Sequence, residues 1–553
     1  MSRNSPRSST PERGQPLRVA MVACPYGDGP ERVPPLGAMS VLAYVQDALG
    51  PWVQTHLFDF SGYPRSSQAA LARIAAWQPQ VVGVPIYSSQ VAIVDDWVAQ
   101  LRARLPAAVF VAGGPHPTLT TETFLRRRTH LFDAIVRGDG ERPFVAILDR
   151  VAAGCRRFEV PGVSYVAADG GIVEMPDGEQ LAPDAMADPF SVPITHANAP
   201  LVFTDRRTGR QRSAVALVSS RSCPLKCSFC AIIAMPGKWR SVPDDTLLAW
   251  LCAEHARAPF EHIYFMDANF FVVPRRVRGL SSAIAERLPG VTWSASSTVG
   301  MLLKLEADLP LLARQGLRMV EMGIEAASDD QLAFLNKRSS VATNRQAVRA
   351  LQRNGIDIGI DFIMFNPDQT LADLEANVAF FRDCDLTLHE DFGHLFNGLT
   401  LYPGTPLRRT YEQRLGASFD PDRLPVVDPL FRDPQVQAVY RAFTGPFRRR
   451  YMRRVERLRD AARAAARRLA DTDSGRAQRL RLEAIRIHHV PLKVLQQLCR
   501  AEAGAPLESA VPLLAGWNAY ERRVRALCGA ATAEAEPAAA QRPAAARLEA
   551  GAE

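Results

Sequence analysis

Several features that would place this chain in a membrane or outside the cell are missing from its sequence. Although 47% of its 553 residues are hydrophobic, no apolar run approaches the roughly 20 residues that a membrane-spanning helix needs. Residues 1–16 are rich in Ser, Arg and Pro without an apolar stretch, so we expect neither a secretory signal nor an anchor. The nine cysteines are odd in number and lack the spacing of a disulfide framework. We therefore expect a cytoplasmic protein with no membrane partner.

Common nucleotide-binding motifs are also missing. No G-x-G-x-x-G opens the first helical stretch, and there is no phosphate-binding loop. The net charge of +8 comes largely from Arg, but no basic run alternates with base-stacking aromatic residues. These absences argue against nucleic acid as a partner.

What is present is a repeated alternation of short apolar runs and amphipathic stretches. Between residues 17 and 150 this pattern predicts a doubly wound, Rossmann-like α/β domain with parallel strands. A second series between residues 214 and 410 predicts a partial (β/α)6 barrel whose last strand spans 395–401. Arg-rich helical patterns then predict a helical C-terminal domain. The expected division is 1–16 disordered, 17–150 first domain, 151–213 linker with a hairpin signal, 214–410 barrel, 411–528 helical domain and 529–553 disordered tail.

Three cysteines stand close together directly after the apolar run 214–220. Cys223, Cys227 and Cys230 lie at positions i, i+4 and i+7, with Phe229 before the last of them. Closely spaced thiolates select zinc or iron–sulfur clusters. A structural zinc site needs four ligands, and no fourth Cys or His follows nearby, so one coordination position stays open. A zinc-stabilised protein that binds nucleic acid through basic helices is the alternative from a different functional class.

The spacing C-x3-C-x2-C resembles the cluster motif of radical S-adenosylmethionine (SAM) enzymes. The resemblance implies that the three cysteines bind three irons of a 4Fe–4S cluster and that SAM chelates the fourth iron. It also implies an electron donor, such as flavodoxin or ferredoxin, whose electron leads to cleavage of SAM to a 5′-deoxyadenosyl radical.

Residues at the expected strand ends of the barrel match positions that bind SAM in the same family. Asp267 and Asn269 follow the second strand, where relatives hold the amino group of SAM. Ser296 ends the third strand. Glu325 ends the fourth, where a carboxylate can accept two ribose hydroxyl groups. In the segment 366–370 Asn replaces a Gly of the family pattern, which leaves the adenine contact open.

The first domain resembles the cobalamin-binding domain that is fused to many radical SAM enzymes. The resemblance lies in residues 34–37, 113–118 and 138–141, whose glycines let the backbone approach a flat corrin ring closely. Relatives that ligate cobalt through a His use D-x-H-x-x-G after the first strand, whereas residues 24–32 contain no His. The resemblance therefore implies base-off cobalamin without a His ligand. The residues expected to contact it are Tyr26, Gly27, Arg65, Ser88, Ser89, Gly113, Gly114, Pro115, His116, Gly138, Gly140 and Glu141.

The two sets of motifs, in this order, imply a cobalamin-dependent radical SAM methyltransferase. Such an enzyme moves a methyl group from SAM via methylcobalamin to a carbon centre, here of a small-molecule or peptide natural-product intermediate. Two alternatives remain within the family: a cyclase or ring-rearranging enzyme with the same cofactors, and methyl transfer to an sp2 carbon by a polar route. The sequence identifies neither the substrate nor a catalytic residue.

Overall fold

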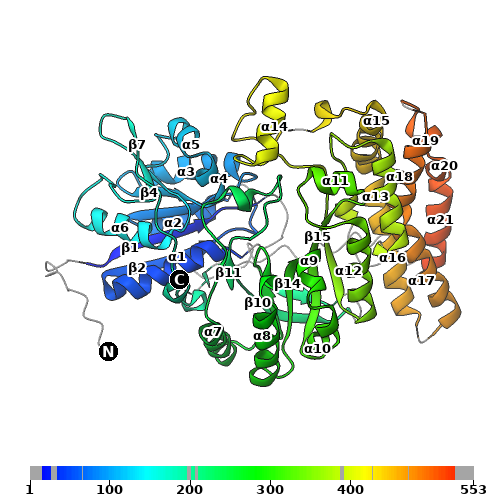
Figure 1. Cartoon of the computed structure of the whole chain (residues 1–553), viewed down its shortest axis with the longest axis horizontal. Helices are drawn as coiled ribbons and strands as arrows, with labels where there is room; N and C mark the ends of the chain where they lie inside the picture. Colours follow the sequence, from blue (N-terminus) through cyan, green and yellow to red (C-terminus); the bar gives the residue numbers. More distant parts are fainter. Residues whose placement is uncertain are drawn as a thin grey trace.

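The computed structural model describes residues 15–26, 34–64, 67–192, 194–195, 201–205, 209–386, 392–425, 427–470, 472–502 and 504–529. The predicted disordered ends fall almost wholly outside these residues, as do Gly27 and Arg65. Two sheets and a helical region follow one another along the long axis of the molecule (Figure 1).

The first sheet is parallel at its centre and carries helices on both faces. Its strand order is β7-β6-β5-β4-β3-β1-β2-β8. The central strands are β1 (Leu17–Ala23), β2 (Val53–Asp59), β3 (Val81–Pro85), β4 (Val109–Gly113) and β5 (Ala134–Val136). One apolar core lies under α1 (Leu36–Leu49) and α6 (Glu141–Ala152), and another under α2 (Gln68–Ala76), α3 (Val91–Arg104) and α5 (Thr121–Arg127). This arrangement confirms the predicted doubly wound α/β domain.

The order of the strands reverses between β1 and β3. The chain continues from β1 to β2 on one side, and β3, β4 and β5 follow on the other side. In open α/β sheets, ligands bind beyond the carboxyl ends of the strands at such a reversal. The short helix α4 (Pro115–Leu119) begins at this edge, directly after β4.

The predicted linker, residues 151–213, contributes strands to both sheets. β6 (Val163–Val166) and β7 (Ile172–Glu174) form an antiparallel hairpin that extends the first sheet beyond β5. β8 (Ile194–Thr195) pairs with β2 at the opposite edge. β9 (Val202–Thr204) pairs with β10 of the second sheet. The segment therefore belongs to the sheets as well as connecting them.

The second sheet curls into a half-barrel (Figure 1). Its parallel strands are β10 (Gln211–Leu217), β13 (His262–Phe265), β14 (Thr292–Thr298), β15 (Leu317–Glu325) and β16 (Asp357–Phe362). Apolar side chains of the intervening helices pack on its outer face; these helices are α7 (Asp244–Arg257), α8 (Pro274–Arg287), α9 (Val299–Leu303), α10 (Leu309–Arg314), α12 (Val341–Arg353) and α13 (Leu371–Asp383).

The sixth barrel strand, expected at residues 395–401, is reduced to one bridge. Gly398 pairs with Phe365 in parallel, and residues 392–396 form a 3-10 turn instead. Gly404, with φ at +76°, turns the chain soon afterwards into α14 (Pro406–Leu415). These two turns leave too few extended residues between them to form a full set of strand hydrogen bonds. The prediction of a sixth strand at residues 395–401 is therefore wrong beyond this one bridge.

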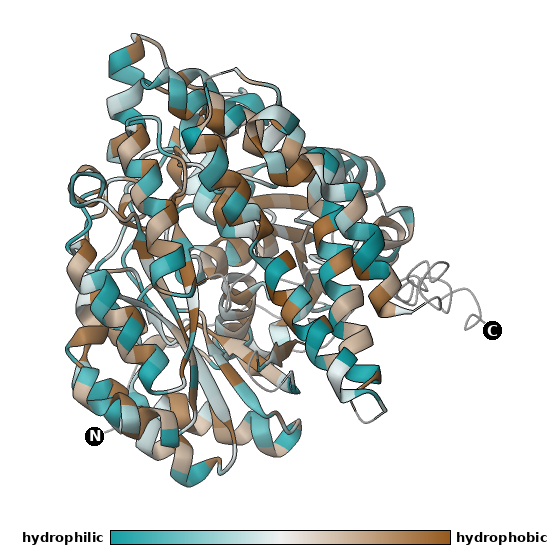
Figure 2. Ribbon diagram, turned by 90° about the vertical axis from the view of Figure 1, so that its right-hand side faces the viewer, coloured by the Kyte–Doolittle hydropathy of each residue, from teal (hydrophilic) through white to brown (hydrophobic). Residues whose placement is uncertain are grey.

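The C-terminal region is helical, as predicted. It contains α15 (Pro434–Ala442), a π-helical segment (Phe443–Met452), α16 (Arg453–Arg468), α17 (Ser474–His488), α18 (Val490–Arg500), α19 (Leu507–Ala510), α20 (Pro512–Ala515) and α21 (Trp517–Cys528). Helix α18 packs on α13, and the apolar core of the barrel continues into the helical region. Figure 2 shows hydrophilic residues alternating with hydrophobic ones along these helices, as expected for half-buried helices. Within the described part of the chain, no helix has the length and apolar composition to cross a bilayer.

One buried histidine ties β9 to the barrel. The ring of His262 is fully buried and stacks on Phe203 with 3.7 Å between the ring centroids. Its Nδ1 lies 2.8 Å from Thr292 Oγ1, and its Nε2 lies 3.0 Å from Ser294 Oγ. Burial lowers the pKa of His262 to about 3, and the nearby charges of Arg212 and Arg318 contribute to this decrease.

This histidine predicts a loss of stability in acid. An unfolded chain protonates a histidine near pH 6.5, whereas folded His262 has a pKa of about 3. The stability due to the neutral ring is therefore complete above about pH 6.5 and falls as the pH drops toward 3, by up to about 1.4 kcal/mol per pH unit. We expect His262→Gln to show a smaller fall in melting temperature between about pH 7.5 and pH 5 than wild type. His255→Gln, on α7, is the matched control, and an equal fall in His262→Gln and wild type would contradict the prediction.

Candidate functional site

The three motif cysteines lie on one loop whose ends are tied together. Strands β11 (Ser220–Arg221) and β12 (Arg240–Ser241) pair antiparallel at its base. Ser228, within the loop, donates its N–H to the Leu335 carbonyl at 3.0 Å and accepts from the Leu407 N–H at 2.9 Å. The cysteine loop, residues 222–239, is thus held at its base and at its middle.

The three thiols are close enough to affect one another. Cys227 is buried and Cys223 and Cys230 are half-buried. Burial raises the pKa of the Cys227 thiol, the Lys337 ammonium opposes the rise, and Cys230 and Cys223 add to it. Among the described residues no three Cys, His, Asp or Glu side chains form a site for a single metal ion. In a multi-iron cluster each thiolate binds a different iron, so neighbouring thiols on one loop can share such a cluster.

Asp267 anchors the chain just before the cysteine loop. Its carboxylate is 2% exposed. It accepts hydrogen bonds from the Ser219 N–H (2.6 Å) and Oγ (2.7 Å) and from the Ser220 N–H (3.1 Å) and Oγ (2.8 Å). Each carboxylate oxygen therefore has two protein donors. The structure thus shows Asp267 as an anchor of the chain, and its contact with SAM stays a prediction.

Asn269 presents an unused hydrogen-bond acceptor. Its side chain is fully buried, and its Oδ1 has no partner among the described residues. Its Nδ2 lies 3.5 Å from Thr298 Oγ1, at the end of β14. A buried amide oxygen without a donor is costly, so a ligand with an amino group fits this position. The amino group of SAM is such a donor.

Glu325 and Lys337 form a buried ion pair beside the cysteines. Lys337 Nζ lies 2.8 Å from Glu325 Oε1, and both side chains are 7% exposed. Glu325 has φ at +66°. A Cβ on Gly323 would lie 2.5 Å from Lys337 Nζ and 2.7 Å from Glu325 Oε1, so a larger residue there would displace the paired groups. Burial raises the pKa of the Glu325 carboxyl, and the Lys337 ammonium opposes the rise.

Lys337 escaped sequence reasoning, because a single lysine twelve positions after Glu325 carries no motif of its own. Ser296, in contrast, was predicted and lies at the end of β14, where its Oγ donates to Glu321 Oε2 at 3.1 Å. Asn269 and the Glu325–Lys337 pair offer polar groups suited to SAM, whereas Ser296 is engaged with a neighbouring carboxylate.

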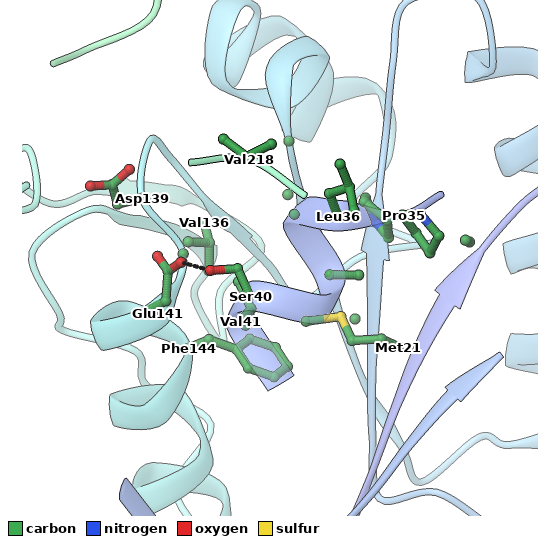
Figure 3. A pocket seen from close by; sticks show the side chains of 18 of the residues that line it. Met21, Pro35, Leu36, Ser40, Val41, Val136, Asp139, Glu141, Phe144 and Val218 are labelled. Carbon is green, nitrogen blue, oxygen red and sulfur yellow. Dashed lines mark hydrogen bonds between the residues drawn. The ribbon is translucent and has the colours of Figure 1, made fainter. Parts of the chain in front are cut away.

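A cavity of about 260 Å³ opens beyond the carboxyl ends of the first sheet. It lies at the reversal of strand order between β1 and β3, and Figure 3 shows Met21, Leu36 and Glu141 among the side chains that line it. Seven predicted cobalamin contacts line it: Tyr26, Gly113, Gly114, Pro115, Gly138, Gly140 and Glu141. Its wall also includes Val218, Arg221, Val242 and Trp250 from the barrel side.

Two glycines let the wall of this cavity pack tightly. Gly114 has φ at +93°, and a Cβ there would lie 3.0 Å from the Ile86 backbone N. A Cβ on Gly83 would lie 2.4 Å from Met21 Sδ. Most other lining side chains, including Phe144, are apolar. Apolar walls with a few polar groups have the chemistry suited to a flat ring with a polar edge, such as a corrin.

Three predicted contacts lie away from the cavity lining. His116 is fully buried; its Nδ1 lies 3.0 Å from Ser88 Oγ and its Nε2 lies 3.3 Å from Asp422 Oδ1. Ser88, Ser89 and His116 are not among the lining residues. His116 therefore joins the first domain to the segment after α14, a contact across 306 positions that no local pattern indicates.

Comparisons with known proteins agree with this geometry. The family model of the radical SAM superfamily matches residues 217–381, and that of the B12 binding domain matches residues 20–148. An uncharacterized methyltransferase of Pyrococcus horikoshii is 27% identical over 399 residues, which cover 71% of this chain and 82% of that protein. An anaerobic magnesium-protoporphyrin IX monomethyl ester cyclase of Rubrivivax gelatinosus is 24% identical over 392 residues, or 66% of each chain.

A solved structure shares the fold. The cobalamin-dependent SAM radical enzyme OxsB, with aqua-cobalamin and SAM bound, has a TM-score of 0.67 and 15% sequence identity, covering 93% of this chain and 78% of that chain. The two matched domains, the cysteine loop and the cavity define a radical SAM enzyme with a cobalamin-binding domain. The chain belongs to the cobalamin-dependent radical SAM enzymes, whose cofactors are a 4Fe–4S cluster, SAM and cobalamin.

The cysteine loop predicts a loss of iron on mutation. After anaerobic reconstitution, wild type is expected to hold about four irons and four sulfides per chain. Cys227→Ala removes a thiolate ligand and should lose most of this iron, whereas Cys252→Ala, on α7, should keep it. Iron and sulfide analysis measures both. Unchanged iron in Cys227→Ala, or one zinc per chain without iron in wild type, would contradict the cluster.

The buried ion pair predicts that the effects of two substitutions on the free energy of unfolding do not add. Glu325→Gln leaves the Lys337 ammonium buried without its partner, which should cost about 3–5 kcal/mol of stability. The double variant Glu325→Gln/Lys337→Met removes both charges and should regain most of the loss. The midpoints of urea unfolding at constant pH measure these changes in stability. If the double variant is as unstable as Glu325→Gln, the loss does not come from leaving Lys337 without its partner.

Proposed function

We propose that this chain transfers a methyl group from SAM, by way of cobalamin, to a carbon centre of a small-molecule or peptide natural-product intermediate. The observation that carries the proposal is the composition of the cavity wall, which combines Tyr26 of the first domain with Val218, Arg221 and Trp250 of the barrel side. Val218 and Arg221 lie five and two positions before Cys223. The space suited to a corrin therefore borders the base of the cysteine loop.

Bound cobalamin would supply a methyl carrier, and SAM at the cluster would supply the methyl group and a radical source. The residues of the chain supply position and protection. Asn269 offers its free amide oxygen to an amino group. Glu325 offers a carboxylate for hydroxyl groups, and Lys337 offers an ammonium for a carboxylate. Apolar lining residues such as Phe144 exclude water from the cavity.

The absence of a histidine beneath the cobalt is part of the proposal. No histidine is among the described residues that line the cavity. Tyr26, in the loop after β1, lines the cavity. The lining is consistent with base-off cobalamin without a His ligand.

A ring-forming reaction is the second candidate. It is favoured by the cyclase of Rubrivivax gelatinosus, which matches 66% of this chain. The two candidates use the same cofactors and differ in whether the product gains one carbon. Product mass distinguishes them.

An external electron donor completes the proposed reaction. Lys226 and Arg338 are exposed cations, and the hydrogen bond from Asn336 Nδ2 to the Lys226 carbonyl holds their segments together. These two cations at and beside the cysteine loop suit an acidic carrier such as flavodoxin or ferredoxin. The reducing cytoplasm is the compartment in which free thiols and such carriers persist.

Labelled SAM tests the proposal. Anaerobically reconstituted protein with cobalamin, reductant and SAM carrying a deuterated methyl group should place label in the cobalamin fraction without any added substrate. It should also release 5′-deoxyadenosine if the radical route operates. Mass spectrometry measures both. The methyltransferase assignment is wrong if cobalamin is retained and SAM is cleaved but no label reaches cobalamin.

A further inference from the structure

Two arginines stand at the two ends of the cysteine loop. Arg221 is the last residue of β11 and Arg240 is the first of β12, and the two are partners in the short antiparallel ladder. The loop with the three cysteines runs between them. Whatever holds these arginines therefore holds the base of the loop.

Both arginines bind carboxylates of the first domain. Arg221 Nη1 lies 2.9 Å from Asp139 Oδ1 and 3.2 Å from Glu141 Oε2, and its Nη2 donates to Glu141 Oε1 and to Ser40 Oγ. Arg240 Nη2 donates to Asp139 Oδ2. Ser40 Oγ in turn donates to Glu141 Oε1 at 2.8 Å (Figure 3). We call these five residues, Ser40, Asp139, Glu141, Arg221 and Arg240, the loop-base clamp.

The clamp is shielded from water. The side chain of Glu141 is 2% exposed, and those of Arg221 and Arg240 are 19% and 11% exposed. Burial lowers the pKa of Arg221, but the charges of Glu141 and Asp139 outweigh it and raise the pKa above its usual value. All five groups are thus charged or hydrogen-bonded, and a change at one of them affects the others.

Four members of the clamp also line the cavity suited to a corrin. They are Ser40, Asp139, Glu141 and Arg221. A molecule bound in that cavity therefore touches the same side chains that fix the base of the cysteine loop. The geometry provides one continuous network between the two cofactor sites.

We propose that the loop-base clamp couples cobalamin binding to the state of the cysteine loop, with Arg221 and Arg240 as positioning residues. The inference rests on the proposed function, because it places cobalamin in the cavity and the cluster on the loop. A ligand in the cavity contacts four members of the clamp and favours its bonded state, and the bonded clamp holds the two ends of the cysteine loop. By linkage, an assembled cluster must then raise the affinity for cobalamin by the same factor.

A second set of ion pairs, which joins the first domain to the segment after α14, provides the control. Asp422, after α14, accepts from Arg127 at 2.8 Å and from Arg128 at 3.0 Å and contacts His116. None of these residues lines the cavity. Loss of Asp422 weakens the docking of the first domain without breaking the clamp.

The experiment measures the dissociation constant of hydroxocobalamin for the full chain, cluster-free and cluster-loaded, by anaerobic absorption titration. We expect wild type to bind at least about 5-fold more tightly when the cluster is present. Arg221→Met should bring the ratio close to one. Arg221→Lys keeps the positive charge but loses the planar guanidinium, so it should keep part of the wild-type ratio. Asp422→Asn should lower thermal stability and keep the wild-type ratio.

The outcomes separate the coupling from the proposed function. A ratio of one in wild type that binds both cofactors, or an unchanged ratio in Arg221→Met, overturns the coupling and leaves the proposed function standing. Wild type that holds neither iron nor cobalamin overturns the proposed function, and the coupling with it. If Arg221→Met does not melt cooperatively, Arg240→Met removes the other arm of the clamp and must show the same loss.

Discussion

The carboxylate of Asp267 fixes the point at which the barrel sheet passes into the cysteine loop. Burial raises the pKa of this carboxyl and disfavours its charge. Four hydrogen bonds from Ser219 and Ser220 offset that cost. Because β11 and Cys223 follow directly, the position of the thiols relative to the barrel depends on this anchor. The loop itself has little core of its own, so the constraint must come from outside it.

The same need explains why contacts reach the loop from distant parts of the chain. Ser228 is bonded to the segments of Leu335 and Leu407, and Asn336 holds the Lys226 carbonyl. A cluster requires thiolates at fixed mutual distances, and a loop free to move would lose that geometry on each opening. Anchors on several elements of the barrel keep the loop in place before any cofactor binds.

The sequence predicted what local patterns can specify. Buried parallel strands are continuous apolar runs, so both α/β regions could be predicted from the sequence. The spacing of Cys223, Cys227 and Cys230 is a motif in itself. Contacts between distant charges leave no such trace. The Lys337–Glu325 pair and the contact between His116 and Asp422 depend on the completed fold. The sixth strand failed for a related reason, because turns on both sides decide whether an apolar run can pair.

Charged contacts at the junction of the two domains serve orientation more than stability. The free energy needed to remove a guanidinium and a carboxylate from water is about as large as the free energy gained from their attraction. The ion pair between Arg221 and Glu141 therefore adds little net stability. Apolar walls, by contrast, tolerate sliding because their attraction has no direction. A guanidinium fork accepts a carboxylate in few geometries. The apolar lining can therefore enclose a large ring, while the arginine forks decide where the cysteine loop sits against it, and a reaction shared between two cofactors depends on that placement.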